Sequence, residues 1–363
     1  MDATALQNLP TPLLLVRLDR VRANLARMEE LLAVRGGLAR WRPHVKTAKV
    51  PEVLELLLAH GLRRFKCATT REARVLLELA DRRGDSIDLL VAFAHRGANL
   101  ARIVELARQH PGQKLSMLSG DAAHARDLRE YGLGVFIDLD PGMGRSGIAL
   151  DDRARIREVA LAAGSALRGW HAYEGHMRAT TVAERRTACA PLFDALTDLA
   201  LYLGSREHET ITSGTPTFVE ALEHRGLAAL QHSISPGIVV YWDHNSAALG
   251  LQGFRCAASV LARVISRPRT DRVTVDAGSK SVDASVADPC VLVAGHPGLV
   301  ATRPSEEHLP LEVRSGPLPE LGALLELEPR HVCPMVNLAE RCALLEGDEL
   351  LRIASVSARA HGD

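Results

Sequence analysis

Short apolar runs alternate with longer amphipathic segments from about residue 36 to residue 245. In longer segments such as "VPEVLELLLAHGL", "TREARVLLELADRRG" and "GANLARIVELARQH", apolar positions recur with the spacing of one helix face, which predicts helices. The short runs predict strands near residues 38–44, 64–68, 87–91, 114–118, 134–139, 167–173, 208–213 and 230–235. This alternation predicts an α/β fold that closes as a TIM-like (β/α)8 barrel.

The pattern changes beyond about residue 245. The runs "ASVLARVISRP", "DRVTVDAGS", "CVLVAGHPG" and "LLRIASVSARA" are typical of strands, and no long helical pattern separates them. We therefore expect a barrel over residues 19–245 and a mostly antiparallel β domain over residues 246–363. Residues 1–18 contain the run "PLLLVRL", which could contribute a strand to that second domain.

Composition narrows the class of protein. The chain of 363 residues is long enough for both domains, and its 44 basic side chains balance 44 acidic ones, so we expect no nucleic-acid partner. The first apolar run has no basic residues before it and is broken by Arg17 and Asp19, so it fits neither a signal peptide nor a membrane span. Six cysteines lie far apart without a CxxC pair, which argues against a disulfide framework. We expect a cytoplasmic protein.

Loops at the carboxyl ends of the strands form the active site of a (β/α)8 barrel. Lys46, in "RPHVKTAKVPE", lies just after the first predicted strand. By position alone it would be a surface lysine, as most lysines are.

The loops after the last two predicted strands resemble a phosphate site. They read "TSGTPT", with Ser213, Gly214 and Thr215, and "SPGIV", with Gly237 and Ile238. Such loops hold a phosphate in many barrels through backbone N–H groups. Either motif alone is more often an ordinary turn.

Two further loops carry candidate side chains. Arg145 stands among three glycines in "DLDPGMGRSG", either as a solvated residue of a flexible turn or as a fixed cation close to a ligand. Tyr173 and His176, in "WHAYEGHM", are either capping core residues or groups that contact a ring and handle protons.

His331 and Cys333, in "PRHVCPMVN", are two positions apart. If the segment is extended, both side chains point to one face and form half of a tetrahedral zinc site. A core histidine and cysteine that meet by coincidence are the alternative, because catalytic zinc usually has three protein ligands.

Several of these segments together resemble the D-threonine aldolase and D-serine dehydratase family, whose members are fold type III enzymes related to alanine racemase. The resemblance runs from about residue 11 to the end of the chain. It rests on "TPLLLVRLDRVRANL", "RPHVKTAKVPEV", "CATTREARVL", "DLDPGMGRSGI", "SGTPT", "SPGIVVYWD", "EEH" and "HVCPMVNL". The most specific parts are "RPHVKT" and "HVCP".

The resemblance implies pyridoxal phosphate (PLP) and a divalent metal as cofactors, and a homodimer as the assembly. Lys46 would be the Schiff-base lysine, and the "TSGTPT" and "SPGIV" loops would form the phosphate cup. Arg145 would contact the cofactor, and Tyr173 would lie against its ring. His331 and Cys333 would be the metal ligands.

The metal ligands bear on the reaction. Aldolase members commonly carry His-x-Asp, whereas Cys333 matches the zinc-dependent dehydratases; thiolate prefers Zn²⁺, while carboxylate admits Mn²⁺ or Mg²⁺. We therefore expect a lyase that converts D-serine, or a related 3-hydroxy D-amino acid, to a keto acid and ammonia, with Lys46 as the base. The alternative is aldol cleavage to glycine and an aldehyde, with His176 as a base.

A racemase and a non-enzymatic PLP-binding protein are less favoured. A racemase would need a second proton donor, typically a tyrosine of the β domain, and all four tyrosines precede residue 246. A simple PLP carrier would need neither the second domain nor the pair of metal ligands.

Overall fold

The structure is a computed structural model that describes residues 6–177, 179, 181–204 and 207–361. The part of the predicted N-terminal strand segment that covers residues 1–5 lies outside the described residues. The chain folds into two compact units. The barrel unit contains Glu29–Lys46, Leu54–Gly237 and His361–Asp363, and the β unit contains Met1–Met28, Thr47–Val53 and Ile238–Ala360.

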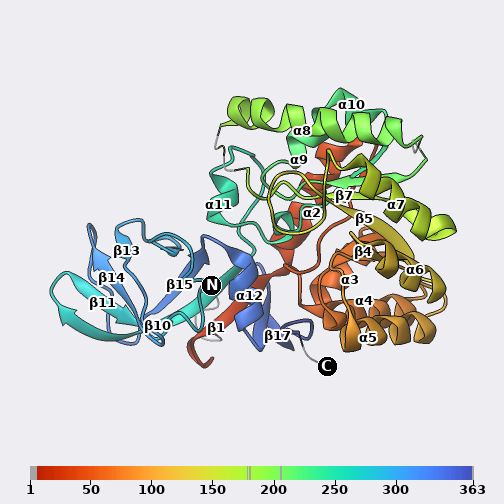
Figure 1. Cartoon of the computed structure of the whole chain (residues 1–363). Helices are drawn as coiled ribbons and strands as arrows, with labels where there is room; N and C mark the ends of the chain where they lie inside the picture. Colours follow the sequence, from red (N-terminus) through yellow and green to blue (C-terminus); the bar gives the residue numbers. More distant parts are fainter. Residues whose placement is uncertain (1–5, 178, 180, 205–206, 362–363) are drawn as a thin grey trace. The chain divides into compact units, whose positions relative to one another are not determined.

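Seven of the eight predicted parallel strands form the barrel sheet (Figure 1). Their order follows the chain, and each pairs with the next: β2 (Arg64–Cys67), β3 (Asp88–Val91), β4 (Lys114–Ser119), β5 (Gly134–Asp140), β7 (Leu167–Ala172), β8 (Glu209–Thr212) and β9 (Gln231–Ile234). A short strand, β6 (Ile148–Ala149), pairs with β5 off this path.

The first predicted strand, residues 38–44, is not a regular strand. Leu38–Arg40 forms a 3₁₀-helix, and only Trp41 and His44 form isolated parallel bridges, to Ile234 of β9 and Lys66 of β2. Pro43 lies between these bridges and has no N–H to donate to a ladder, which explains the interruption. Because the two bridges reach opposite ends of the sheet, this irregular segment closes the barrel.

Helices lie on the outside of the parallel strands, as Figure 1 shows for α4, α5, α6 and α7. The helix α4 begins with a capping box between Thr69 and Glu72 and ends at Gly84, whose φ is 70°. The helices are α2 (Leu18–Ala33), α3 (Pro51–Ala59), α4 (Thr70–Arg83), α5 (Gly97–Gln109), α6 (Ala122–Glu130), α7 (Arg153–Ala163), α8 (Val182–Tyr202), α9 (Phe218–Glu223), α10 (Arg225–Ala228), α11 (His244–Ala247) and α12 (Val332–Leu338). Short 3₁₀-helices also occupy Gly164–Ala166 and Ile238–Val240.

The barrel interior combines apolar side chains with buried ion pairs, among them that of Arg42. Leu90, Leu118, Phe136 and Ile211 pack together on the inside. The Arg42 side chain is fully buried, and its Nη2 lies 2.8 Å from Glu209 Oε2.

The β unit confirms the predicted antiparallel fold. Its strands include β10 (Ala258–Arg269), β11 (Arg272–Val275), β12 (Val291–Val293), β13 (Leu299–Ala301), β14 (Leu309–Val313) and β15 (Leu324–Pro329). They pair in the order β11-β14-β13-β12-β15-β10, and β10 also pairs with β11, which closes a barrel. The strand β1 (Leu13–Arg17) pairs with β10 and with β16 (Arg341–Glu346), which pairs with β17 (Glu349–Ser355).

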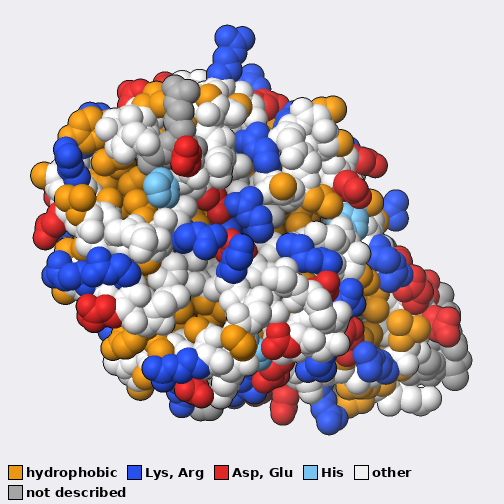
Figure 2. All heavy atoms as spheres, turned by 90° about the vertical axis from the view of Figure 1, so that its right-hand side faces the viewer, with side chains coloured by type: hydrophobic (Ala, Val, Ile, Leu, Met, Phe, Trp, Pro, Cys, Tyr) orange, Lys and Arg blue, Asp and Glu red, His pale blue; other side chains and the backbone are white. Residues whose placement is uncertain are grey.

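Charged side chains of both signs share the surface of the protein (Figure 2). Basic and acidic side chains are interspersed on the face shown in Figure 2, without a large area of one sign. Within the described part of the chain, no helix combines the length and the apolarity that a membrane crossing requires. All six cysteines are free thiols.

Candidate active site

Lys46 follows the irregular segment that closes the barrel, and its side chain is exposed. Its Nζ lies 6.0 Å from the centre of the Tyr173 ring, at the end of β7. Arg145 lies closer, with its guanidinium carbon 5.0 Å from the same ring centre. Two predicted residues from distant parts of the barrel unit, Lys46 and Arg145, therefore lie near the ring of a third, Tyr173.

Two glycines position the Tyr173 ring. A Cβ on Gly175 would lie 2.3 Å from Cε1 of the ring, and a Cβ on Gly214 would lie 2.9 Å from Cε2. Any larger residue at either position would displace the ring. The close approach of these two backbone positions is the local reason why glycine is needed there.

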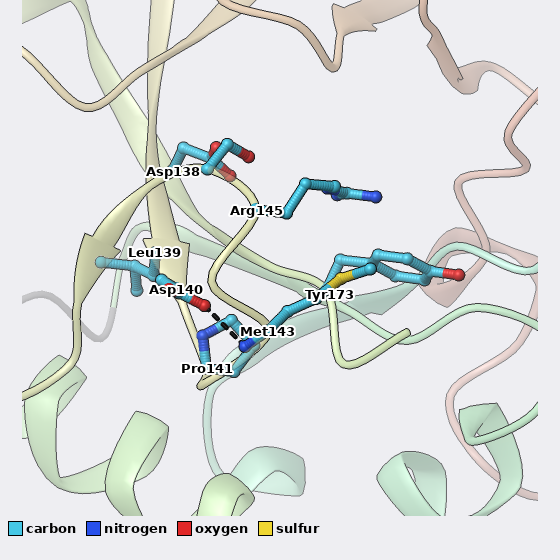
Figure 3. A pocket seen from close by; sticks show the side chains of 8 residues that line it. Asp138, Leu139, Asp140, Pro141, Met143, Arg145 and Tyr173 are labelled. Atoms are coloured by element: carbon cyan, nitrogen blue, oxygen red, sulfur yellow. Dashed lines mark hydrogen bonds between the residues drawn. The ribbon is translucent and has the colours of Figure 1, made fainter. Parts of the chain in front are cut away.

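The loop that carries Arg145 is held in place. Asp140 Oδ1 accepts hydrogen bonds from the backbone N–H groups of Gly142, Met143 and Gly144, at 3.0, 2.8 and 3.1 Å. The side chain of Arg145, from this loop, lies close to that of Tyr173, which follows β7 (Figure 3). A small pocket there is lined by Asp138, Leu139, Asp140, Pro141, Met143, Arg145, Ser146 and Tyr173.

The predicted phosphate loop after β8 is held by the buried carboxylate of Glu174. Thr217 Oγ1 donates to Glu174 Oε1 at 2.5 Å, and the Ser213 N–H donates to Oε2 at 3.3 Å. The Thr215 hydroxyl is buried and has no hydrogen-bond partner among the described residues. A buried hydroxyl without a partner is costly unless a ligand satisfies it, so this loop fits a bound phosphate.

The second loop joins the first through one backbone hydrogen bond. The Ser235 N–H donates to the Ser213 carbonyl at 3.0 Å. Gly237 follows, and Ile238 begins the short 3₁₀-helix Ile238–Val240.

His176 lies beside the Arg145 loop. Its Nε2 is 3.9 Å from the point where a Cβ on Gly142 would stand. Its Nδ1 is buried and has no hydrogen-bond partner among the described residues. The structure thus leaves a ring nitrogen of His176 available to a ligand or water.

A buried polar chain inside the barrel was missed by the sequence analysis. Lys66 Nζ lies 3.3 Å from His171 Nε2, and His171 Nδ1 lies 3.0 Å from Asp138 Oδ1. Burial and the charge of Lys46 lower the pKa of Lys66 to about 7. The available signal was a titratable residue in each of three strands, Lys66 in β2, Asp138 in β5 and His171 in β7.

The predicted metal ligands stand at the start of a helix, so the condition of an extended segment is not met. His331 precedes α12, and Cys333 is within it. The Val332 N–H, which has no partner inside the helix, donates to Asp243 Oδ2 at 3.1 Å. Thr47 Oγ1 lies 3.1 Å from Cys333 Sγ.

His331 is oriented by a carboxylate. Its Nδ1 lies 3.0 Å from Asp283 Oδ2, which leaves Nε2 as the nitrogen for a metal. Burial would lower the pKa of His331, but its hydrogen bond to Cys333 and the charges of Cys333, Asp243 and Asp283 raise the pKa to about 9. A cation is therefore favoured at this place, and the imidazole and thiol donors fit Zn²⁺.

Comparisons with known proteins identify two family models that match this chain. Residues 16–244 match the family model described as "Alanine racemase, N-terminal domain", and residues 257–345 match the model described as "Putative serine dehydratase domain". Both units of the chain are thus represented.

Individual relatives span nearly the whole chain. It is 30% identical to D-threonine aldolase of Arthrobacter sp over 98% of this chain and 94% of that enzyme. It is 27% identical to D-threo-3-hydroxyaspartate dehydratase of Delftia sp. (strain HT23) over 90% and 92%. The crystal structure of D-threonine aldolase from Filomicrobium marinum has the same fold, with a TM-score of 0.84 at 24% identity over 98% and 96%. The chain therefore belongs to the fold type III family related to alanine racemase that includes these aldolases and dehydratases, and it is a lyase.

Proposed function

We propose that this chain is a PLP- and zinc-dependent dehydratase of β-hydroxy D-amino acids, of which D-serine is the simplest. The single observation that carries the choice of dehydration is the pair of donors, His331 and Cys333, with Asp283 behind the histidine. A thiolate selects zinc over the metals that a carboxylate would admit.

Enzymes of this family depend on PLP and a metal ion. When bound, PLP supplies an electron sink for negative charge at the substrate Cα. Lys46 would hold the cofactor covalently, and Tyr173 and Arg145 would position its ring. The unpartnered Thr215 hydroxyl supports a phosphate site in the loop after β8.

A divalent metal held by His331 and Cys333 would supply a Lewis acid toward the β-hydroxyl. Asp283 would fix the imidazole so that Nε2 faces the metal. Thr47 would hold the Cys333 sulfur in place through their 3.1 Å contact. Thr47 directly follows Lys46 in the chain.

The proton chemistry falls to Lys46. Its free amine is the natural acceptor of the Cα proton. Loss of that proton and of the β-hydroxyl releases water, and hydrolysis of the resulting enamine consumes water and gives a keto acid and ammonia.

Aldol cleavage is the second candidate, and the 30% identity to D-threonine aldolase favours it. In that reaction His176, whose Nδ1 is buried without a partner among the described residues, would accept the proton of the β-hydroxyl. Cleavage of the Cα–Cβ bond would give glycine and an aldehyde.

One experiment separates the two candidates. Protein loaded with PLP and Zn²⁺ is incubated with D-serine, D-threonine and D-3-hydroxyaspartate, and keto acid and glycine are measured separately. Keto acid without glycine supports dehydration, whereas glycine with an aldehyde establishes the aldolase. Lys46→Ala should lose both activity and the visible absorbance of covalently bound cofactor, while Lys114→Ala, at an exposed position on β4, is the control.

We also propose a homodimer, in keeping with the family resemblance. Sedimentation equilibrium of the PLP-loaded protein measures the mass directly, and a monomer would contradict this assignment.

A further inference from the structure

A second group of potential metal ligands lies in the β unit. His244, Cys256 and Glu328 each offer one ligand atom, and these atoms all lie within 4.8 Å of one another. Among the described residues, no other three His, Cys, Asp or Glu side chains meet this condition. All three are partly buried, so an ion could enter from solvent and exchange most of its water for protein ligands.

Backbone hydrogen bonds hold the three ligands in register. The N–H of the residue after His244 donates to the carbonyl of Arg330, 3.1 Å away and two positions after Glu328. The N–H of the residue after Cys256 donates to the carbonyl of Tyr241 at 2.7 Å. The start of α11, the end of β15 and the loop before β10 are therefore connected by backbone hydrogen bonds. The relative positions of the three ligands are thus set by the backbone as well as by their side chains.

The donor set is that of a transition metal. Imidazole, thiolate and carboxylate together suit Zn²⁺, and three protein ligands leave a fourth tetrahedral position for water. His244 Nε2 already lies 2.9 Å from Glu328 Oε2, so only a small separation would admit an ion between them. A thiolate and a carboxylate would balance the charge of a divalent ion.

The electrostatic surroundings of Cys256 are negative. Burial raises the pKa of its thiol, and the charges of Glu328 and Asp243 raise it further, to about 12. These carboxylates favour a cation next to the sulfur, and a metal would bind by replacing the thiol proton.

One cation already lies nearby, and it defines the competing explanation. Arg20 Nη1 is 3.9 Å from Glu328 Oε1 and donates to the Cys256 carbonyl at 2.8 Å. An ion pair of Arg20, Glu328 and protonated His244 could exist without a metal. However, Arg20 approaches Oε1, and the other carboxylate oxygen, Oε2, is the one that faces His244.

We propose that His244, Cys256 and Glu328 bind a second divalent transition-metal ion, with the chemistry of Zn²⁺, separate from the ligands His331 and Cys333. The ion would link α11, β15 and the loop before β10 through its ligands. This inference does not depend on which reaction the enzyme catalyses.

The test counts metal ions on the full-length, PLP-loaded protein. Metal is removed with a chelator, Co²⁺ is added back, and bound cobalt is measured after dialysis, together with the absorbance of cobalt–thiolate bonds. We expect two Co²⁺ per chain in the unaltered protein. Cys256→Ala should bind one fewer, Cys333→Ala should lose the other ion, and the buried Cys290→Ala should keep both.

The decisive comparison is between Cys256→Ala and the unaltered protein. The proposal would be overturned if both proteins bound the same number of Co²⁺ ions and showed the same cobalt–thiolate absorbance. If Cys256→Ala does not fold, Glu328→Gln keeps the side-chain size and removes a ligand charge. Loss of one ion in that variant supports the site, and no loss refutes it.

Discussion

Replacing Lys66 with methionine should stabilise the protein at neutral pH, although it removes a hydrogen-bonding group. Lys66 is only 4% exposed, and it lies near the cations Lys46 and Arg145. Burial first, and then the charge of Lys46, lower its pKa from 10.5 to about 7. The folded state therefore binds the Lys66 proton more weakly than the unfolded chain does.

The sign of the pH dependence follows from this difference. Between about pH 7 and pH 10.5 the unfolded chain holds a proton that the folded protein has released, so stability rises with pH in this window. A tenfold change in proton affinity corresponds to about 1.4 kcal/mol. The full penalty below pH 7 is therefore about 5 kcal/mol, and most of it, about 3 kcal/mol, disappears between pH 7 and pH 10.

The assay is urea unfolding of the cofactor-free protein, followed by circular dichroism at several pH values from 7 to 10. The advantage of Lys66→Met over the unaltered protein should shrink by about 3 kcal/mol across this range. Lys114→Met, at an exposed position on β4, should show a constant difference. The reasoning is refuted if Lys66→Met is less stable at pH 7, or if its difference does not change with pH.

If Lys66→Met stabilises the protein but lowers its turnover, Lys66 contributes to activity. Proteins keep destabilising groups where activity requires them. Lys66 contacts His171 and raises the positive charge near Lys46. Loss of keto acid formation in a more stable Lys66→Met would thus assign the buried chain to the reaction.

Three further outcomes are expected. Asp283→Asn should weaken metal binding at His331 and Cys333 about 10–100-fold, because His331 loses the carboxylate that orients its ring. Dialysis against a metal buffer measures this affinity, and an unchanged value would contradict the orienting role of Asp283. Gly175→Ala should displace the Tyr173 ring and weaken PLP binding, seen in a cofactor titration; equal affinity would mean the ring is not a cofactor contact. Burial raises the pKa of Glu209, but Arg42 and a neighbouring arginine lower it to about 2. The stability that the ionised carboxylate contributes is therefore present above pH 4.5, and it is lost as the pH falls toward 2. Glu209→Gln should therefore cost about 3 kcal/mol at pH 7 and progressively less below pH 4.5 in acid unfolding; a constant difference would argue against the ion pair.

Local patterns were sufficient for the fold class and for most elements. The periodicity of "TREARVLLELADRRG" and "GANLARIVELARQH" predicted α4 and α5, because an amphipathic helix shows its buried face in the spacing of its apolar residues. The segment 38–44 shows the limit of such patterns. Its composition resembles a strand, but Pro43 interrupts the ladder, and only long-range pairing with β2 and β9 shows that it closes the barrel.

The sequence by itself determined the order of helices and strands, the change from a parallel to an antiparallel sheet, and the motifs that carry the family resemblance. Tertiary structure alone decided which side chains meet. Lys66, His171 and Asp138 come from three strands, and Asp283 reaches His331 across 48 positions. His244, Cys256 and Glu328 likewise come from separate segments and meet only in the folded protein. Periodicity reports burial along one element, whereas a contact between elements depends on strand register and barrel closure, which no local spacing encodes.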